Sequence, residues 1–135
     1  MPEEFVISKC SPTMAGLKTG NLFSCPAEDG DSLRDSIRRL NATLVPRGAR
    51  ILPVKRMRGR VLCYMYRPEK LKEDLSGELA QSILAARAYP VGNADRCVAE
   101  LCRRLQSDAA FPHEVGLFLG YPAIFTVFYR SGSYF

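Results

Sequence analysis

The sequence predicts an α+β domain: an irregular N-terminal segment, a helix, a basic β-hairpin and then three to four helices. Two observations lead to this prediction. Two β-branched and apolar runs, 51–54 and 61–66, flank a short basic turn, a pattern typical of a hairpin. Before them, apolar side chains recur at the intervals of three and four that are typical of an amphipathic helix, at Leu33, Ile37, Leu40 and Leu44.

Residues 1–31 are expected to be irregular, because several glycines and prolines divide them into short pieces. Within them, residues 5–7 (Phe-Val-Ile) fit a short strand or the end of a helix. Asp31-Ser32 then offers an N-cap for the first long helix. Pro46 and Gly48 end that helix after about three turns.

Helices are expected to follow the hairpin. Pro68 suits the first position of a helix that runs through Leu75. A second helix begins near Gly77 and stops at Pro90, and Asn93 caps a third that runs to about Ser107.

Composition indicates one globular domain, which we place at residues 1–122, with a divergent C-terminal tail at 123–135. The chain has 135 residues, of which 47% are hydrophobic and 24% charged. No apolar run reaches the 18 residues that a membrane-spanning helix needs, so no membrane partner is expected. The N-terminus carries Glu3 and Glu4 where a signal peptide needs basic residues, so we expect a cytoplasmic protein.

The cysteines indicate neither a disulfide framework nor a metal site. They are odd in number and contain no closely spaced pair of the kind that structural zinc requires. We therefore expect small buried thiols, no metal and no cofactor. The five are Cys10, Cys25, Cys63, Cys97 and Cys102.

Positive charge is concentrated in the middle of the chain. The net charge is +5, yet residues 36–68 hold nine basic side chains and no acidic one. Several of them, Arg56, Arg58 and Arg60 among them, lie at the tip of the expected hairpin. Such a tip suits phosphate groups, and Tyr64 and Tyr66 share one strand face on which bases would stack. A solvated basic surface explains the same pattern.

The segment from Cys10 to Asn21 is the first candidate binding loop. It lacks the glycines of a phosphate-binding P-loop, but it is rich in hydroxyl groups and glycine. Such loops bind small anions through backbone amides, and Lys18, Thr19 and Asn21 would serve as ligand-binding residues. A plain structural turn is the alternative.

The segment Phe111–Pro122 holds the only histidine, beside a glutamate. His113 and Glu114 lack the second histidine, four residues on, of a zinc peptidase. Pro112 suits the first turn of a helix, and Gly116 and Gly120 would leave a flat face for close packing. A tightly packed helix explains most of the segment, and a ligand-binding or proton-transfer role for His113 is the alternative.

Three segments together resemble a known family. They are CSPTMAGLKTGNLFS at 10–24, the stretch from Leu40-Asn41 through YMYRP at 64–68, and FPHEVGLFLGYP at 111–122. They are similar to the signatures of an uncharacterised domain family of anaerobic Gram-positive bacteria, and the resemblance covers about residues 5–122. That family is a domain of unknown function, so the resemblance implies no reaction, cofactor or catalytic residue.

The resemblance also implies a longer C-terminal part than the one printed here. Members continue after Gly-Tyr-Pro with an acidic helix and a cysteine-bearing region, whereas this chain ends with 123–135. We therefore expect a truncated member. Residues 124–129 are strand-prone and nearly uncharged, so self-association through the tail is a further expectation.

These observations favour a small binding or regulatory module, for a small anionic ligand or a protein partner, over a self-sufficient enzyme. An enzyme would need a site assembled from the 10–21 loop with His113 and Glu114, in which Cys10 is a further catalytic candidate. Nucleic-acid binding through the basic hairpin is the second alternative.

Overall fold

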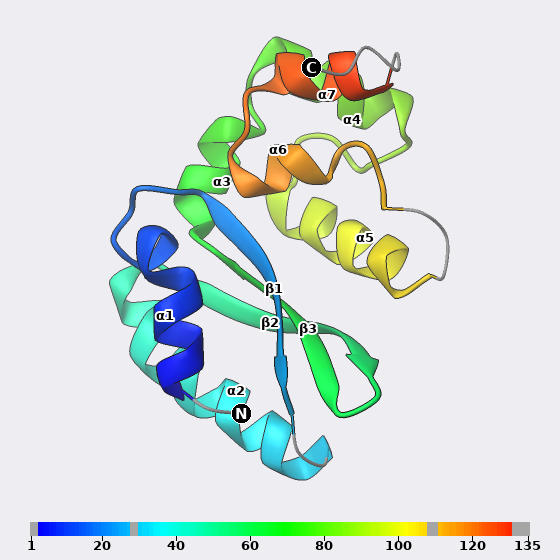
Figure 1. The fold of residues 1–135 in the computed structure, drawn as a ribbon. Coiled ribbons are helices and arrows are strands. Elements are labelled where there is room, and N and C mark those ends of the chain that lie inside the picture. Colours follow the sequence, from blue (N-terminus) through cyan, green and yellow to red (C-terminus); the bar gives the residue numbers. More distant parts are fainter. Residues whose placement is uncertain (1–2, 28–29, 108–110, 131–135) are drawn as a thin grey trace. The chain divides into compact units, whose positions relative to one another are not determined.

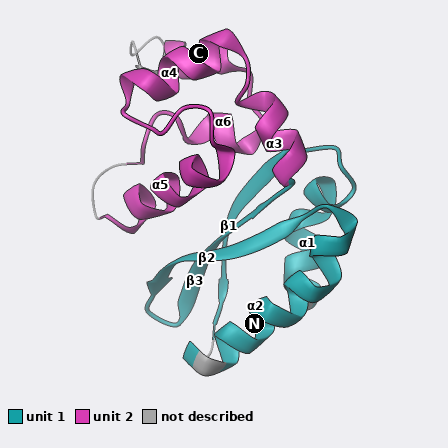
Figure 2. Cartoon of the chain, turned by 180° about the vertical axis from the view of Figure 1, so that it is seen from behind, with its two compact units in different colours: residues 1–67 teal, residues 68–135 magenta. Residues whose placement is uncertain are grey.

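A computed structural model describes residues 3–27, 30–107 and 111–130. It confirms the α+β class. The chain forms two compact units, unit 1 at Met1–Arg67 and unit 2 at Pro68–Phe135 (Figure 2). Each is described by itself, and the single domain expected at 1–122 stays a prediction.

Unit 1 contains a three-stranded antiparallel sheet in the order β1-β3-β2. Strands β2 (Arg50–Met57) and β3 (Arg60–Tyr66) form the predicted hairpin. Its two-residue turn places Gly59 at a φ of 68°, a conformation that glycine adopts without strain. Strand β1 (Gly20–Pro26) pairs with β3 along its whole length and was not predicted.

The expectation of an irregular segment at 1–31 is wrong. Residues Glu3–Met14 form helix α1, which includes the Phe-Val-Ile run, and β1 follows it. The buried positions of α1 are Val6, Cys10 and Thr13, whose spacing of four and three is helical. Thr13 is polar and Pro12 lies inside the helix, so the apolar periodicity of this segment is weak.

Helix α2 (Gly30–Leu44) is the predicted amphipathic helix, and it begins at Gly30 rather than at Asp31-Ser32. Helices α1 and α2 lie on the same face of the sheet (Figure 1). Their buried side chains form one core with alternate residues of the strands, such as Phe23 of β1 and Cys63 of β3. This core explains why the apolar positions of α2 recur with helical spacing.

A side chain of α2 forms hydrogen bonds with the outer backbone edge of strand β2. Asn41 Oδ1 accepts a hydrogen bond from the Ile51 amide at 2.9 Å, and Asn41 Nδ2 donates one to the Ile51 carbonyl at 3.0 Å. We call this pair of bonds the Asn41–Ile51 clasp. Exposed strand edges invite pairing with other chains, and the clasp occupies both backbone groups of Ile51.

Unit 2 consists of helices in its described part. The predicted helices are confirmed as α3 (Pro68–Asp74), α4 (Glu78–Ala86) and α5 (Ala94–Gln106). Asn93 is the predicted N-cap of α5, since its Oδ1 accepts a hydrogen bond from the Arg96 amide at 3.0 Å.

The C-terminal part of unit 2 differs from the prediction. Helix α6 (Val115–Leu119) begins three residues after Pro112. Gly120, with a φ of 92°, ends it instead of extending a packing face. The expectation of close packing holds for Gly116, because a Cβ there would lie 3.3 Å from the Tyr121 ring.

The tail is helical, not strand-like. Residues Ala123–Arg130 form α7, which packs on α4 and α6, so five helices follow the hairpin within the described ranges. Tertiary contacts override the strand propensity of this apolar run: Thr126 is buried and faces Gly116. Residues 131–135 of the expected tail lie outside the described residues. Among the described helices, none is long and apolar enough to cross a membrane.

Replacing Asn41 with alanine is expected to lower the free energy of unfolding by about 1 to 2 kcal/mol, because two hydrogen bonds are lost and the β2 edge opens. Urea denaturation followed by circular dichroism measures this change. Thr43→Ala, an exposed change on the same helix, is the control and should shift stability by less than about 0.5 kcal/mol. Equal effects of the two substitutions would contradict a structural role for the clasp.

Candidate functional site

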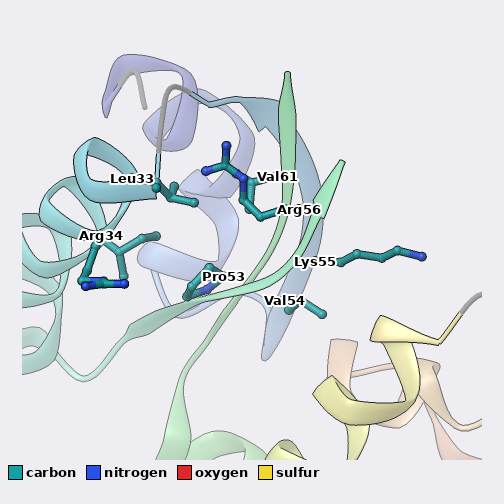
Figure 3. Close-up of a pocket in the computed structure, with 9 residues that line it drawn as sticks. Leu33, Arg34, Pro53, Val54, Lys55, Arg56 and Val61 are labelled. Atoms are coloured by element: carbon teal, nitrogen blue, oxygen red, sulfur yellow. The ribbon is translucent and has the colours of Figure 1, made fainter. Parts of the chain in front are cut away.

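A groove in unit 1 lies between α2 and the edge strand β2 (Figure 3). Its volume is about 420 Å³, within the usual size range of small-molecule pockets. Its walls are aliphatic and basic. The residues that line it are Gly30, Leu33, Arg34, Ile37, Pro53, Val54, Lys55, Arg56 and Val61.

The first wall is a stripe on α2. Gly30, Arg34 and Ile37 are spaced by four and three residues, so they lie on one helix face. The same stripe continues to Asn41, which binds Ile51 of β2. The clasp therefore fixes this face of α2 against the edge strand.

The second wall is an irregular stretch of β2. Pro53 pairs with Cys63 and Lys55 with Leu62, so Val54 is an extra residue in the ladder, a β-bulge. Pro53 has no amide hydrogen to offer at the edge. The bulge lies beside α2 and supplies the middle of the wall.

The charge of the groove comes from both walls. Arg34 projects from α2, and Arg56 projects from β2 on the same side as Leu33, whereas Lys55 extends away from α2 (Figure 3). None of the lining residues that the structure describes is acidic. Guanidinium groups bind carboxylates and phosphates through paired hydrogen bonds, so the groove suits an anion with an apolar portion.

The three predicted arginines of the hairpin have different surroundings. Arg56 lines the groove, and Arg58 lies exposed in the turn. Arg60 Nε donates a hydrogen bond to Ser24 Oγ at 2.7 Å, and its Nη2 donates one to the Ser24 carbonyl at 3.0 Å. Arg60 therefore ties β3 to β1.

The side chains of Tyr64 and Tyr66 on β3 stack on each other. The rings of Tyr64 and Tyr66 lie 4.8 Å apart and are nearly parallel. The predicted sharing of one strand face is thus confirmed. Binding of nucleic acid by this hairpin stays a prediction.

The predicted loop at 10–21 is part of the packing of unit 1. Asn21 Nδ2 donates to the Lys9 carbonyl at 2.9 Å and contacts Cys10 Sγ at 3.7 Å. Thr19 is buried, and Lys18 is half-buried. These contacts join the end of α1 to the start of β1 and support the structural interpretation of the loop.

Arg67 holds the same region from the end of β3. Its Nη1 donates to the Met14 carbonyl at 3.3 Å and its Nη2 to the Arg47 carbonyl at 3.2 Å. A Cβ on Gly48 would lie 3.1 Å from that Nη2, so glycine leaves room for the guanidinium. One of the nine basic residues counted in the sequence thus bridges two helical ends.

In the Phe111–Pro122 segment, Glu114 is the buried member of the pair and His113 is exposed. Glu114 Oε2 accepts a hydrogen bond from the Tyr89 hydroxyl at 2.7 Å and one from Arg104 Nη1 at 3.2 Å. Its Oε1 accepts from Arg87 Nε at 3.2 Å. A buried carboxylate with three donors of this kind stabilises the loop between α4 and α5 and the start of α6.

Arg104 extends this network. Its guanidinium lies 4.2 Å from the centre of the Tyr89 ring, and its Nη2 donates to the Arg87 carbonyl at 2.6 Å. Its Nε pairs with Glu100 at 2.6 Å. Cation–π contact and ion pairing together hold α5 against the end of α4.

The network sets the ionisation of its acids. Burial acts to raise the pKa of Glu114, but the Tyr89 hydroxyl, the local backbone, Arg87 and Arg104 outweigh it and lower that pKa below 4.5. Hydrogen bonds from Arg103 and Arg104 lower the pKa of Glu100 to about 2. Burial and the Glu114 carboxylate raise the pKa of Tyr89, so its hydroxyl stays a donor.

Four of the five thiols are buried and that of Cys102 is half-buried. Burial raises the pKa of Cys10 to about 11, which disfavours the thiolate that a nucleophile needs. Among the described residues, no three potential ligands of the His, Cys, Asp and Glu types gather around a point that would hold a metal. The enzyme hypothesis combines the 10–21 loop of unit 1 with His113 and Glu114 of unit 2, and it stays a prediction.

Sequence reasoning did not single out Arg34. Its place on the α2 stripe is visible in the sequence, four residues after Gly30 and seven before Asn41. The packing of that stripe beside the β2 bulge is not visible in the sequence, because it depends on how the helix lies along the edge strand.

A family model described as "Protein of unknown function (DUF3793)" matches residues 6–124. This range contains the three segments on which the sequence resemblance was based. No curated protein and no solved structure matches the chain.

Replacing Glu114 with glutamine is expected to lower the free energy of unfolding by about 3 kcal/mol, because it leaves Arg87 and Arg104 facing an uncharged, buried group. Urea denaturation measures the change. His113→Gln, on the exposed neighbour, is the control and should change stability by less than about 0.5 kcal/mol. A larger loss from the histidine variant would show that the segment depends on His113.

Stability is also expected to depend on pH through this network. The folded pKa of Glu114 lies below its ordinary value of 4.5, so its contribution is present above pH 4.5 and is lost as the pH falls through the lowered pKa. The free energy of unfolding should therefore decrease as the pH falls below 4.5. Glu114→Gln should show a shallower decrease, and identical slopes for the two proteins would rule out this linkage.

Proposed function

The chain belongs to the DUF3793 family, whose function is unknown, and we propose that it is a binding module for a small anionic ligand, held in the α2–β2 groove. One observation supports the proposal most directly: Arg34 of α2 and Arg56 of β2 line this groove together with aliphatic side chains, and none of the lining residues within the described part of the chain is acidic.

The aliphatic part of the lining favours an organic anion over an inorganic ion. Burying apolar ligand surface contributes roughly 25 cal/mol per Å² to binding, before ordering costs. The guanidinium groups would orient the anionic end, and Ile37 and Val61 would contact the apolar end. Recognition of this kind needs no catalytic group.

A protein partner that adds a strand to β2 fits the groove less well. The Asn41–Ile51 clasp occupies the backbone of Ile51, and Pro53 provides no donor. The bulge at Val54 interrupts the regular ladder that strand addition continues.

Native mass spectrometry of the protein purified from its own cells tests the proposal. Wild-type protein is expected to retain a small anion. The double variant Arg34→Gln/Arg56→Gln is expected to lose it, because both guanidinium groups are removed. Circular dichroism would establish that the variant is folded.

Arg58→Gln is the matched control. It removes a positive charge of the same hairpin at a residue that does not line the groove. It should retain the anion as wild type does. Equal retention by the double variant, or absence of an anion from the wild-type protein, would count against the proposed function.

A further inference from the structure

We propose that unit 1 binds an anionic lipid surface through the two turns that follow α1 and α2. We call residues 14–17 and 45–50 the Leu17–Val45 surface. It shares no residue with the lining of the α2–β2 groove, so the proposal is independent of the function proposed above. The sequence expectation of no membrane partner concerned spanning segments, whereas the binding proposed here is peripheral.

The turn that ends α1 fixes Leu17 in an exposed position. Gly16 has a φ of 79°, its amide donates a hydrogen bond to the Thr13 carbonyl at 3.1 Å, and the Leu17 amide donates one to the Pro12 carbonyl at 2.8 Å. This is a Schellman motif, in which the apolar residue after the glycine often packs against its own helix. Leu17 is instead 81% exposed. A fixed turn therefore presents a leucine side chain to solvent.

A second exposed apolar side chain lies on the turn that follows α2. Val45 begins the 3-10 helix η1 (Val45–Arg47) and is 55% exposed. The guanidinium of Arg67 joins this turn to the end of α1, because it donates hydrogen bonds to the Met14 and Arg47 carbonyls at 3.3 and 3.2 Å. Leu17 and Val45 are thus held at the same end of unit 1, each within three residues of a carbonyl that Arg67 binds.

The charges at this end favour an anionic partner. Arg47 and Arg50 are both exposed and follow Val45 closely in the chain. They belong to the stretch 36–68, which contains nine basic residues and no acidic one. Anionic lipid headgroups attract arginine side chains near a membrane surface, and apolar side chains beside them enter the boundary between headgroups and acyl chains.

A lipid surface fits these residues better than an acidic protein does. Leu17 and Val45 project from turns, and a protein partner would need a shaped pocket for them within an interface of roughly 800 Å² per partner. A bilayer accepts separate apolar side chains without a preformed pocket. Two apolar and two basic side chains contribute less than a covalent lipid anchor, so we expect weak and reversible binding that depends on salt.

Sedimentation of the full chain with vesicles tests the proposal. Wild-type protein is expected to sediment with vesicles of phosphatidylcholine and phosphatidylglycerol in equal parts, but not with phosphatidylcholine alone. Raising the salt concentration should reduce the bound fraction, because it screens the attraction. Leu17→Ser and the double variant Arg47→Gln/Arg50→Gln should each lower the apparent affinity by about tenfold or more. Circular dichroism would establish that both variants are folded.

Two matched controls assign the binding to this surface. Ile7→Ser changes an apolar residue of α1 that is 50% exposed, and Arg58→Gln removes an exposed positive charge in the hairpin turn. Both should keep the affinity within about twofold of wild type, because neither residue belongs to the Leu17–Val45 surface. Arg34→Gln should do the same, which separates this surface from the groove.

Three results would overturn the proposal. They are no sedimentation of wild-type protein with the anionic vesicles, equal sedimentation with phosphatidylcholine alone, and equal losses from Ile7→Ser and Leu17→Ser. If vesicles are not bound but Leu17→Ser loses a protein that copurifies with wild type, the partner is a protein and the lipid proposal is wrong. None of these results bears on anion retention in the groove.

Discussion

Buried polar groups in a folded protein need hydrogen-bond partners. In this chain the hydrogen bonds of two side chains, Asn41 and Glu114, hold neighbouring elements together. In unit 1, Asn41 binds both backbone groups of Ile51, which fixes α2 along the edge of the sheet. In unit 2, Glu114 is fully buried and accepts hydrogen bonds from Arg87, Tyr89 and Arg104. Each side chain joins segments that are separated in the sequence.

The Asn41–Ile51 clasp also bears on the proposed groove, because the two elements that it joins form the walls of that groove. Arg34 stands two helical turns before Asn41 on the same stripe of α2, and Arg56 stands five residues after Ile51 on β2. The bulge at Val54 lies between Ile51 and Arg56 on the same strand. The groove proposed to bind an anion is thus formed by the same contacts that join α2 to β2.

The candidate functional residues predicted from the sequence divide into two groups. Some have structural contacts: Asn21 packs against the end of α1, and Glu114 forms a buried network with Tyr89 and two arginines, whereas the neighbouring His113 is exposed. Within the basic hairpin, Arg56 lines the proposed groove, whereas Arg60 is hydrogen-bonded to Ser24. A residue type alone does not reveal its partners, so burial and hydrogen bonding had to be known before these roles could be separated.

The sequence by itself determined the α+β class, the hairpin and the helices α2 to α5, because their apolar periodicities and their Pro and Asn signals are local. It did not determine α1 or the helical tail α7. Their buried positions include Thr13 and Thr126, which periodicity of apolar residues does not detect. Only the tertiary structure brought Arg34 and Arg56 to the lining of one groove and gave Glu114 its three donors, because both arrangements join residues that local sequence patterns do not relate.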